Sequence, residues 1–392
     1  MPKKFYLEAK ELYTPTACLK DACVITDGNG RIDYVGPKAA APAVEGVQKI
    51  YAPGLRLAPG FVDIHVHGGH GIAFGVGDKL AEDLQAYSEW VLESGVTAFV
   101  ASISAPSGQE AHDLLTKLVP VLEKGTRGAR VLGLHMEGPF LNVEKKGAFN
   151  PSWLRMPSLD EAKDYIRIAG SWIKQISMAP ELPNALEVAR EFRKAGITVA
   201  MGHTNTDYDT ARAALMGDFT HVTHIFNAQS DFNHRAPGVM GAILASDEIT
   251  GELIADGIHV HPGAMKVLLR CLGTKRVTLI TDAIPGAGLP NGDYNLIGQV
   301  IHVQDGRAFL GNGTLAGSAA VLNRCVRNAV DLAGASVQEA IRMATVNPAR
   351  VIGLDRQYGL IAAGRPADLI LLDDAFEVQM AMVGGEVLFS RL

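Results

Sequence analysis

The chain has 392 residues, too many for one ordinary domain and enough for a large α/β barrel with a small partner domain. Hydrophobic residues make up 47% of the chain and charged residues 20%, the balance of a soluble globular protein. The net charge of −6 and the lack of a basic cluster argue against a nucleic-acid-binding surface. The first residues lack the apolar core of a signal peptide, and no apolar run reaches the ~18 residues of a membrane span. We therefore expect a cytoplasmic protein that binds neither membranes nor nucleic acid.

Both ends of the chain are predicted to consist of short strands. The strand candidates alternate apolar and polar residues or end in glycine-containing turns, as in Asp27-Gly28 and Gly384-Gly385. They are residues 5–14, 22–28, 32–36, 367–373 and 378–390. Neither end alone has enough strands to bury a face. We therefore predict one small β-sandwich domain built from residues 1–57 and 356–392.

The middle of the chain, residues 58–355, alternates apolar strand candidates with amphipathic helices such as residues 182–196. This alternation predicts a parallel sheet, and a count of eight strands favours a closed (β/α)8 TIM-like barrel over an open sheet. The eight candidates are residues 61–67, 97–102, 130–136, 173–179, 197–203, 219–225, 251–256 and 277–283. Residues 292–313 are predicted to form a β-hairpin insertion after the last strand, and residues 335–354 to form the terminal helices.

Most of the predicted barrel strands end in residues that can bind a metal or carry a proton. The carboxyl ends of parallel barrel strands meet at one mouth, where barrel enzymes place their chemistry. The ordered set of imidazoles and carboxylates therefore predicts a metal-dependent hydrolase. Its members are His65, His67, Glu137, His203, His224 and Asp282.

His65 and His67 are two residues apart on one predicted strand, so both imidazoles point to the same side and can bind one ion. The alternative is a pair of packed polar side chains. Their position at the end of a buried strand, directly before Gly68, favours the metal interpretation. Neutral imidazoles suit zinc, iron and other borderline cations, so this pattern does not specify the metal.

Glu137 also ends an apolar run, where an unpaired carboxylate is rarely buried, and it could bridge two cations. His203 and His224 follow consecutive strands and are therefore expected to be neighbours at the barrel rim. His135 is interpreted as an outer-layer or inner-barrel residue rather than a ligand. His221 lies three residues before His224, which predicts a structural residue on the opposite face of that strand.

Asp282 is the predicted proton carrier. Beside a metal-bound water, its carboxylate could accept the water's proton and pass it to a leaving amine. The alternative is a cap on the helix that follows the strand. His259 could donate a hydrogen bond to a substrate carbonyl, whereas His261 is expected at the surface.

The motifs PGFVDIHVHGGHG, LHMEGPFLN, GHTNT, HIFNAQS, ADGIHVH, TDA and GTLAGS together resemble the amidohydrolase superfamily. More narrowly, they resemble the N-acetylglucosamine-6-phosphate deacetylase family, over nearly the whole chain from about Pro59 onward. The resemblance implies metal-dependent hydrolysis of the acetamide of an N-acetylhexosamine 6-phosphate to hexosamine 6-phosphate and acetate. N-acetyl-D-glucosamine 6-phosphate is the expected substrate.

The same resemblance implies roles for particular residues. The metal ligands are Glu137, His203 and His224, and the presence of His65 and His67 leaves a second ion open. Zinc is favoured over iron, cobalt or manganese. Asp282 is implied as the general base and acid. The implied substrate contacts are His259, Asn227, Ala228, Leu315, His234 and Arg235, of which the last two reach the phosphate from the neighbouring subunit of a homodimer.

Two other readings stay open at this point. The chain could be a different amidohydrolase, such as a cyclic-amide hydrolase or a deaminase. It could also be a non-catalytic barrel used as a scaffold, although such relatives usually lose ligands. Some relatives have a histidine where this chain has Phe149, which leaves the preferred hexosamine epimer open.

Overall fold

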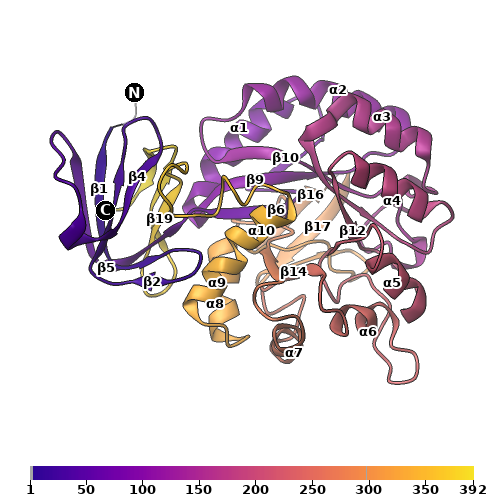
Figure 1. The fold of residues 1–392 in the computed structure, drawn as a ribbon. Coiled ribbons are helices and arrows are strands. Elements are labelled where there is room, and N and C mark those ends of the chain that lie inside the picture. Colours follow the sequence, from indigo (N-terminus) through magenta and orange to yellow (C-terminus); the bar gives the residue numbers. More distant parts are fainter. Residues whose placement is uncertain (1–2, 297) are drawn as a thin grey trace.

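The computed structural model describes residues 3–296 and 298–392. Residues 1–2, at the start of the predicted segment 1–57, and residue 297, in the predicted insertion, lie outside the described residues. Figure 1 shows a barrel surrounded by helices, with a separate sheet beside it that contains strands from both ends of the chain.

The barrel sheet confirms the predicted TIM-like architecture. Its eight strands pair in parallel in the order β15-β14-β13-β12-β11-β10-β9-β6. They are β6 (Phe61–Val66), β9 (Val96–Ile103), β10 (Arg130–Glu137), β11 (Ile173–Met178), β12 (Thr198–Met201), β13 (His221–Val222), β14 (Thr250–Ile254) and β15 (Val277–Ile280). Both faces of these strands are covered, so they read as nearly continuous apolar runs.

Amphipathic helices pack around the barrel, and serine caps fix several of their starts. Ser107 begins α2 by accepting the backbone N–H of Glu110, and Ser158 begins α3 in the same way. The helices are α1 (Leu80–Trp90), α2 (Gly108–Lys124), α3 (Leu159–Ala169), α4 (Ala185–Lys194), α5 (Tyr208–Leu215), α6 (Gly238–Leu244), α7 (Pro262–Leu272), α8 (Leu322–Asp331), α9 (Val337–Met343) and α10 (Val346–Val351). Short 3-10 helices span Lys38–Ala40, Val91–Ser94, Val143–Lys145, Pro151–Trp153 and Gly170–Trp172. None of the described helices is long and apolar enough to cross a bilayer.

The first and last barrel strands, β6 and β15, meet at the site end of the barrel. The backbone N–H of Asp282 donates to the carbonyl of His65 at 2.9 Å, and that of His67 donates to the carbonyl of Ala283 at 2.8 Å. Below them, the buried carboxylate of Asp63 accepts the hydroxyl of Thr281 at 2.5 Å. These bonds join the two ends of the hydrogen-bonded strand order into a barrel.

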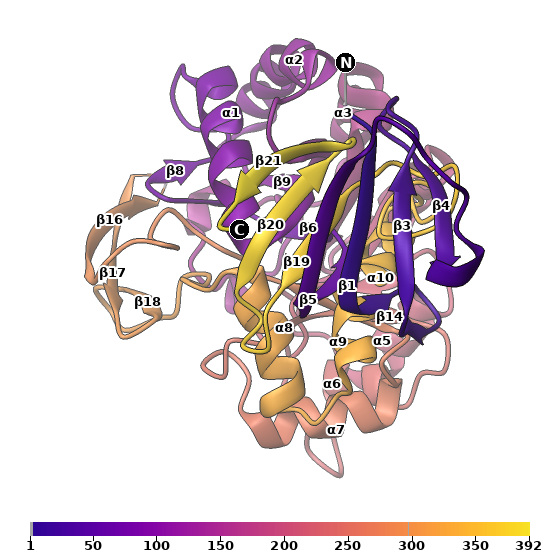
Figure 2. The ribbon, with the colours of Figure 1, turned by 90° about the vertical axis from the view of Figure 1, so that its left-hand side faces the viewer.

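The two chain ends share the second sheet, as predicted. Its strands form one hydrogen-bonded order, β21-β20-β19-β5-β1-β3-β4 (Figure 2). The short strand β2 pairs with β1. The predicted sandwich is thus one continuous sheet, because β5 pairs with β1 on one side and with β19 on the other. The strands are β1 (Phe5–Tyr13), β2 (Cys18–Leu19), β3 (Ala22–Thr26), β4 (Ile32–Pro37), β5 (Gln48–Pro59), β19 (Leu369–Leu372), β20 (Val378–Val383) and β21 (Glu386–Ser390). The domain boundaries at 57 and 356 stay predictions.

The insertion after the barrel contains one more strand than predicted. A three-stranded antiparallel sheet replaces the expected hairpin and consists of β16 (Gly292–Leu296), β17 (Gln299–Gln304) and β18 (Arg307–Leu310). The third strand forms because Asp305 and Gly306 both have positive φ, 51° and 77°, as a tight two-residue hairpin turn requires. Gln299 donates to the carbonyl of Ala148 at 3.1 Å, which ties the insertion to a loop at the barrel mouth. A second short hairpin, β7 (Gly68–Gly69) and β8 (Ile72–Ala73), follows β6.

An ion pair connects the small sheet to the barrel. The carboxylate of Asp368, directly before β19, accepts hydrogen bonds from Nε and Nη2 of Arg130 at 3.2 and 3.3 Å and from the backbone N–H of Gly384 at 2.6 Å.

Replacing Asp368 with Ala should lower the free energy of unfolding by about 1.5–3 kcal/mol, the range for charged hydrogen bonds, because the Arg130 guanidinium loses its counter-charge. Denaturant titration measures this change. Asp374→Ala, which removes an exposed carboxylate paired with Arg56, should cost about 0–1 kcal/mol. Equal losses for the two variants would contradict a special role of Asp368.

Candidate metal-binding active site

The six residues predicted from the strand ends converge at the carboxyl end of the barrel. Glu137 is the last residue of β10, and His203, His224 and Asp282 each lie two residues beyond their strands. Five of the six line a cavity of about 410 Å³, and the sixth, His65, lies fully buried beneath it. The mouth therefore holds the imidazoles and carboxylates that the sequence placed at separate strand ends.

Glu137, His203 and His224 form one tight group. Oε1 of Glu137 lies 3.3 Å from Nε2 of His203 and 3.1 Å from Nε2 of His224, and the two imidazole nitrogens are 3.0 Å apart. All three side chains are buried. The Nδ1 atom of His203 is bonded to the carbonyl of Lys145 at 2.7 Å, so His203 has its Nε2 free to bind a cation.

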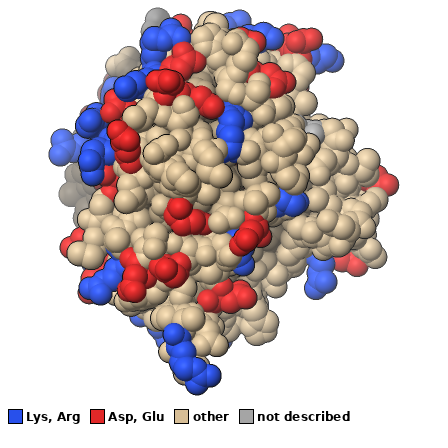
Figure 3. All heavy atoms as spheres, turned by 90° about the vertical axis from the view of Figure 1, so that its right-hand side faces the viewer, with Lys and Arg blue, Asp and Glu red and all other residues tan. Residues whose placement is uncertain are grey.

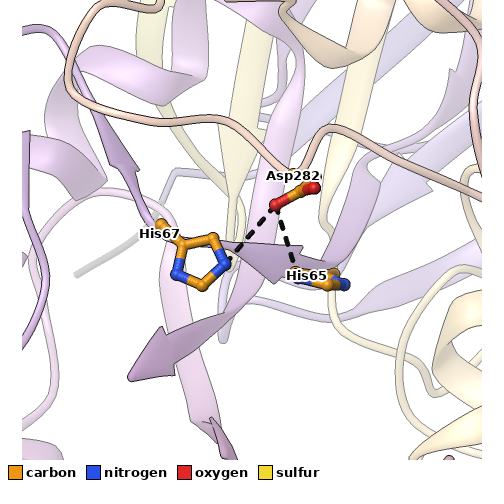
Figure 4. Close-up of side chains that lie close together, drawn as sticks. All are labelled: His65, His67 and Asp282. Atoms are coloured by element: carbon orange, nitrogen blue, oxygen red, sulfur yellow. Dashed lines mark ion pairs between the residues drawn. The ribbon is translucent and has the colours of Figure 1, made fainter. Parts of the chain in front are cut away.

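His65, His67 and Asp282 form a second group (Figure 4). Oδ1 of Asp282 is 3.4 Å from Nε2 of both histidines, and Figure 4 shows the two rings turned toward that carboxylate. The two groups share a neighbour, because Oε2 of Glu137 lies 2.9 Å from Nε2 of His67 while its Oε1 faces the first group. Glu137 thus has the position of a bridge between two cation sites.

The donor set fits a divalent metal. Nε2 of His65 and Nδ1 of His224 are buried without a hydrogen-bond partner among the described residues, an unfavourable state for a polar atom. A cation beside Nε2 of His65 would satisfy that atom and the carboxylates 3.4 Å away from it. Imidazole nitrogens with carboxylate oxygens suit zinc and other first-row metals. The six residues therefore match the ligands of one or two metal ions.

The electrostatics of the site favour the charged form of Glu137. Burial alone would raise the pKa of Glu137, but the charge on His65 and hydrogen bonds from His203 and His224 hold that pKa well below its usual value. Burial would lower the pKa of His65, but the charges of Glu252, Asp282 and Glu137 raise it well above 6.5. The carboxylates around His65 thus favour positive charge at that ring, and a metal ion on Nε2 would supply it in place of a proton.

Two further histidines lie inside the barrel but outside both groups. His135 uses both ring nitrogens, with Ser102 at 2.9 Å and Ser177 at 2.8 Å, and burial lowers its pKa well below 6.5. The prediction that His221 faces away from the interior was wrong, because its Nε2 lies 3.4 Å from Oε1 of Glu252. Since β13 ends at Val222, the strand alternation that the prediction assumed does not extend to His224.

Asp282 and His259 face the same cavity from neighbouring strand ends. Asp282 has a positive φ of 50° and is fixed by backbone bonds to His65 and Ser318. Nδ1 of His259 is bonded to Oδ2 of Asp256 at 2.7 Å, so Nε2 is the nitrogen left for a substrate. Asp256 was missed in the sequence, although it ends the seventh predicted strand as Asp282 ends the eighth.

The predicted substrate contacts separate into two sets. Asn227, Ala228 and Leu315 line the cavity with His259, and the ring of Phe149 stands edge-on to that of His203 at 5.2 Å. In contrast, His234 and Arg235 lie on an exposed turn and do not line the cavity of their own chain. A single chain therefore brings three of the predicted substrate contacts together with His259, whereas His234 and Arg235 lie outside the cavity of their own chain.

Glu252, in the interior of β14, was also missed. Its carboxylate is fully buried, accepts hydrogen bonds from His65, Gln175 and the backbone of His224, and lies 3.4 Å from Nε2 of His221. The charges and hydrogen bonds of His65 and His221 hold its pKa well below the usual value although burial alone would raise it. A glutamate inside an otherwise apolar strand, as in GELIAD, is the signal that could have identified it.

An eight-stranded barrel with histidine and carboxylate groups at the carboxyl ends of its strands defines the class of metal-dependent barrel hydrolases. The family model of the amidohydrolase family matches residues 56–388. The N-acetylglucosamine-6-phosphate deacetylase of Bos taurus is 35% identical over 347 residues, which are 86% of this chain and 84% of that protein.

Solved structures agree with this match. The crystal structure of N-acetylglucosamine-6-phosphate deacetylase from Pasteurella multocida has a TM-score of 0.91 at 31% identity and covers 98% of this chain and 99% of that one. A mutant of the enzyme from Mycobacterium smegmatis, in complex with N-acetyl-D-glucosamine-6-phosphate, has the same TM-score and identity and covers 99% of this chain and 100% of that one. The chain belongs to the amidohydrolase family and, within it, to the N-acetylglucosamine-6-phosphate deacetylases.

Proposed function

We propose that this protein hydrolyses the acetamide of an N-acetylhexosamine 6-phosphate, with N-acetyl-D-glucosamine 6-phosphate as the substrate. The products are hexosamine 6-phosphate and acetate. The observation that carries the proposal is the meeting of Glu137, Asp282 and His259 in one cavity, with four histidine ligand candidates around them. We expect the enzyme to work in the cytoplasm as a homodimer.

The metal is expected to be zinc, with Glu137, His203 and His224 as the ligands of the first ion and His65, His67 and Asp282 around a second position. A divalent cation held by these residues would supply Lewis-acid polarisation and would lower the pKa of a water ligand toward ~7. Glu137 contributes one oxygen to each group, which places both positions within reach of the same carboxylate.

The side chains of the site account for the proton transfers. Asp282 accepts a proton from the attacking water, while Nε2 of His259 donates a hydrogen bond to the substrate carbonyl oxygen as negative charge develops on it. This role requires a proton on Nε2 of His259, while Oδ2 of Asp256 accepts its Nδ1–H at 2.7 Å. Asp282 then gives the proton to the departing sugar nitrogen as the carbon–nitrogen bond breaks.

The experiment that tests this function is acetate release from a panel of N-acetylhexosamine 6-phosphates that differ in epimer, with metal content measured on the same sample. We expect release from the glucosamine derivative in the metal-loaded protein and loss of activity after chelation. Hydrolysis of a cyclic amide or release of ammonia, without acetate, would instead favour another amidohydrolase activity. A protein without bound metal and without turnover would revive the scaffold interpretation.

Phosphate recognition is expected to depend on Arg235. A guanidinium binds a phosphate with two parallel hydrogen bonds, and His234 stands beside it on the same exposed turn. Arg235→Ala should raise KM for the 6-phosphate substrate by the equivalent of about 1.5–3 kcal/mol, the range for charged hydrogen bonds. Activity on the unphosphorylated sugar should barely change. Arg327→Ala, which removes an exposed arginine on α8, is the control. It should leave unchanged both KM for the 6-phosphate and activity on the unphosphorylated sugar. Equal losses on the two sugars would make Arg235 structural.

The same arginine tests whether two subunits share a site. Mixing Arg235→Ala subunits with Asp282→Asn subunits gives hybrid dimers in which one barrel has an intact Asp282 and a partner with an intact Arg235. Such hybrids should regain one working site of two if Arg235 acts across the interface. Hybrids that form but recover no activity would place Arg235 in its own subunit's site.

A further inference from the structure

Glu252 lies at the centre of a buried hydrogen-bond network beneath both ligand groups. Its Oε2 accepts Nδ1–H of His65 at 2.8 Å and the backbone N–H of His224 at 3.0 Å. Its Oε1 accepts Nε2–H of Gln175 at 2.7 Å and lies 3.4 Å from Nε2 of His221. The carboxylate is completely buried and belongs to neither ligand group.

Burying a carboxylate is unfavourable unless its oxygens accept hydrogen bonds. One oxygen of Glu252 accepts such a bond from His65, a histidine of the second group. The bond to Glu252 occupies Nδ1–H of His65, so Nε2 is the nitrogen left to bind a cation, which would take the place of any proton there. That Nε2 lies 3.4 Å from Oε1 of Glu137 and 3.4 Å from Oδ1 of Asp282. The ring of His65 is therefore held with Nε2 facing two carboxylates.

The support of the first group differs in kind. Nδ1 of His203 is bonded to the backbone carbonyl of Lys145. Any residue at position 145 would supply this carbonyl. His65 instead depends on one particular side chain that is contributed by another strand. The availability of its Nε2 to a cation thus depends on the identity of residue 252.

We propose that Glu252 is a positioning residue for a second metal ion, which it allows to bind at His65, His67 and Asp282 by orienting the His65 ring. The proposal rests on the metal site of the proposed function. It concerns this second position, because Glu252 contacts the first group only through the backbone N–H of His224 and is bonded to none of that group's side chains. The chain is then a two-ion enzyme, and residue 252 determines that property.

Cobalt(II) provides a test that does not depend on turnover. The chelated full-length protein is titrated with Co²⁺, and both the number of ions bound and the visible absorption of each are recorded. Wild type should bind two ions per chain. Glu252→Gln should bind the first with unchanged affinity and absorption, and the second about 10–100-fold more weakly, the usual effect of losing such a partner.

Asp63→Asn is the matched control. Asp63 is an equally buried carboxylate of the barrel, but it is bonded to Thr281 and to the backbone of His65 rather than to an imidazole. This variant should keep both ions. Wild-type affinity for two ions in Glu252→Gln, or a single ion in wild type, would overturn the proposal. Acetate release is measured on the same samples. Wild-type protein that binds its ions but releases no acetate would contradict the proposed function without bearing on the role of Glu252.

A second measurement does not depend on the Glu252→Gln variant. In wild-type protein loaded with Zn²⁺ and labelled with ¹⁵N-histidine, the His65 ring should be protonated on Nδ1, with a downfield and slowly exchanging proton. The resonance is assigned by its loss in His65→Asn. A His65 ring that has its proton on Nε2 in the loaded wild-type protein would overturn the proposal.

Discussion

Asp282→Asn is expected to leave the ion at Glu137, His203 and His224 in place and to lower kcat about 10²–10⁴-fold, the contribution of a positioned acid or base. The amide has nearly the same shape as the carboxylate but cannot carry a proton at neutral pH. Asn also tolerates the positive φ of 50° at this position, so the backbone bonds to His65 and Ser318 should persist. Steady-state kinetics with metal analysis of the same sample measures the effect.

Two conditions must hold before a lower kcat can be attributed to the loss of proton transfer by Asp282. The variant must keep the first ion, and KM must stay close to the wild-type value, because Asp282 is proposed to act on the proton rather than to bind the sugar. Loss of the second ion alone would be consistent with the position of Asp282 between His65 and His67. A kcat near wild type, with the first ion confirmed, would remove Asp282 from the mechanism.

Glu137→Gln should abolish both metal binding and turnover while the barrel stays folded. Its two oxygens serve both groups, Oε1 toward His203 and His224 and Oε2 toward His67. Loss of this charge should weaken metal binding by more than the ~10–100-fold typical of partners that only support a ligand. Metal content by elemental analysis, activity, and the thermal midpoint are measured together.

Glu144→Gln is the control for this variant. Glu144 also lines the cavity, but its carboxylate is exposed and bonded to the side chain of Asn205. Metal content in this variant should match that of wild type. Full acetate release by a Glu137→Gln protein that has lost its metal would refute the assignment of Glu137 as a ligand.

Much of the site was predictable because barrel geometry brings strand ends together. The eight apolar runs each appear as a strand, and His65, His67, Glu137, His203, His224 and Asp282 all lie at or just beyond the ends of five of them. The position of a residue relative to its strand end therefore carries information on its neighbours in space, although the residues are far apart in sequence.

The supporting residues were harder to predict because contacts across the barrel interior leave no local pattern. Glu252 lies within a strand, and its bonds to His65 and Gln175 join strands that are far apart in the chain. His221 was assigned to the wrong face because β13 is only two residues long, so alternation could not be extended to its neighbours. The third strand of the insertion depended on one turn at Asp305.

The charged surface of the molecule carries less information on function than the interior. Figure 3 shows acidic and basic side chains interspersed on the face that lies away from the small sheet. The basic pair His234 and Arg235 lies on an exposed turn and would not be singled out by the structure of one chain. Its proposed role depends on a second subunit and therefore on solution experiments.

The join between β6 and β15 has a consequence for how the protein folds. His65 and Asp282 belong to the first and last barrel strands, and the backbone bond between them closes the barrel. Contacts between such distant parts of the chain close a long loop, which costs conformational entropy. The proposed second ion position has its full set of residues only when the barrel is closed, so occupancy of this position would report that the first and last strands have met.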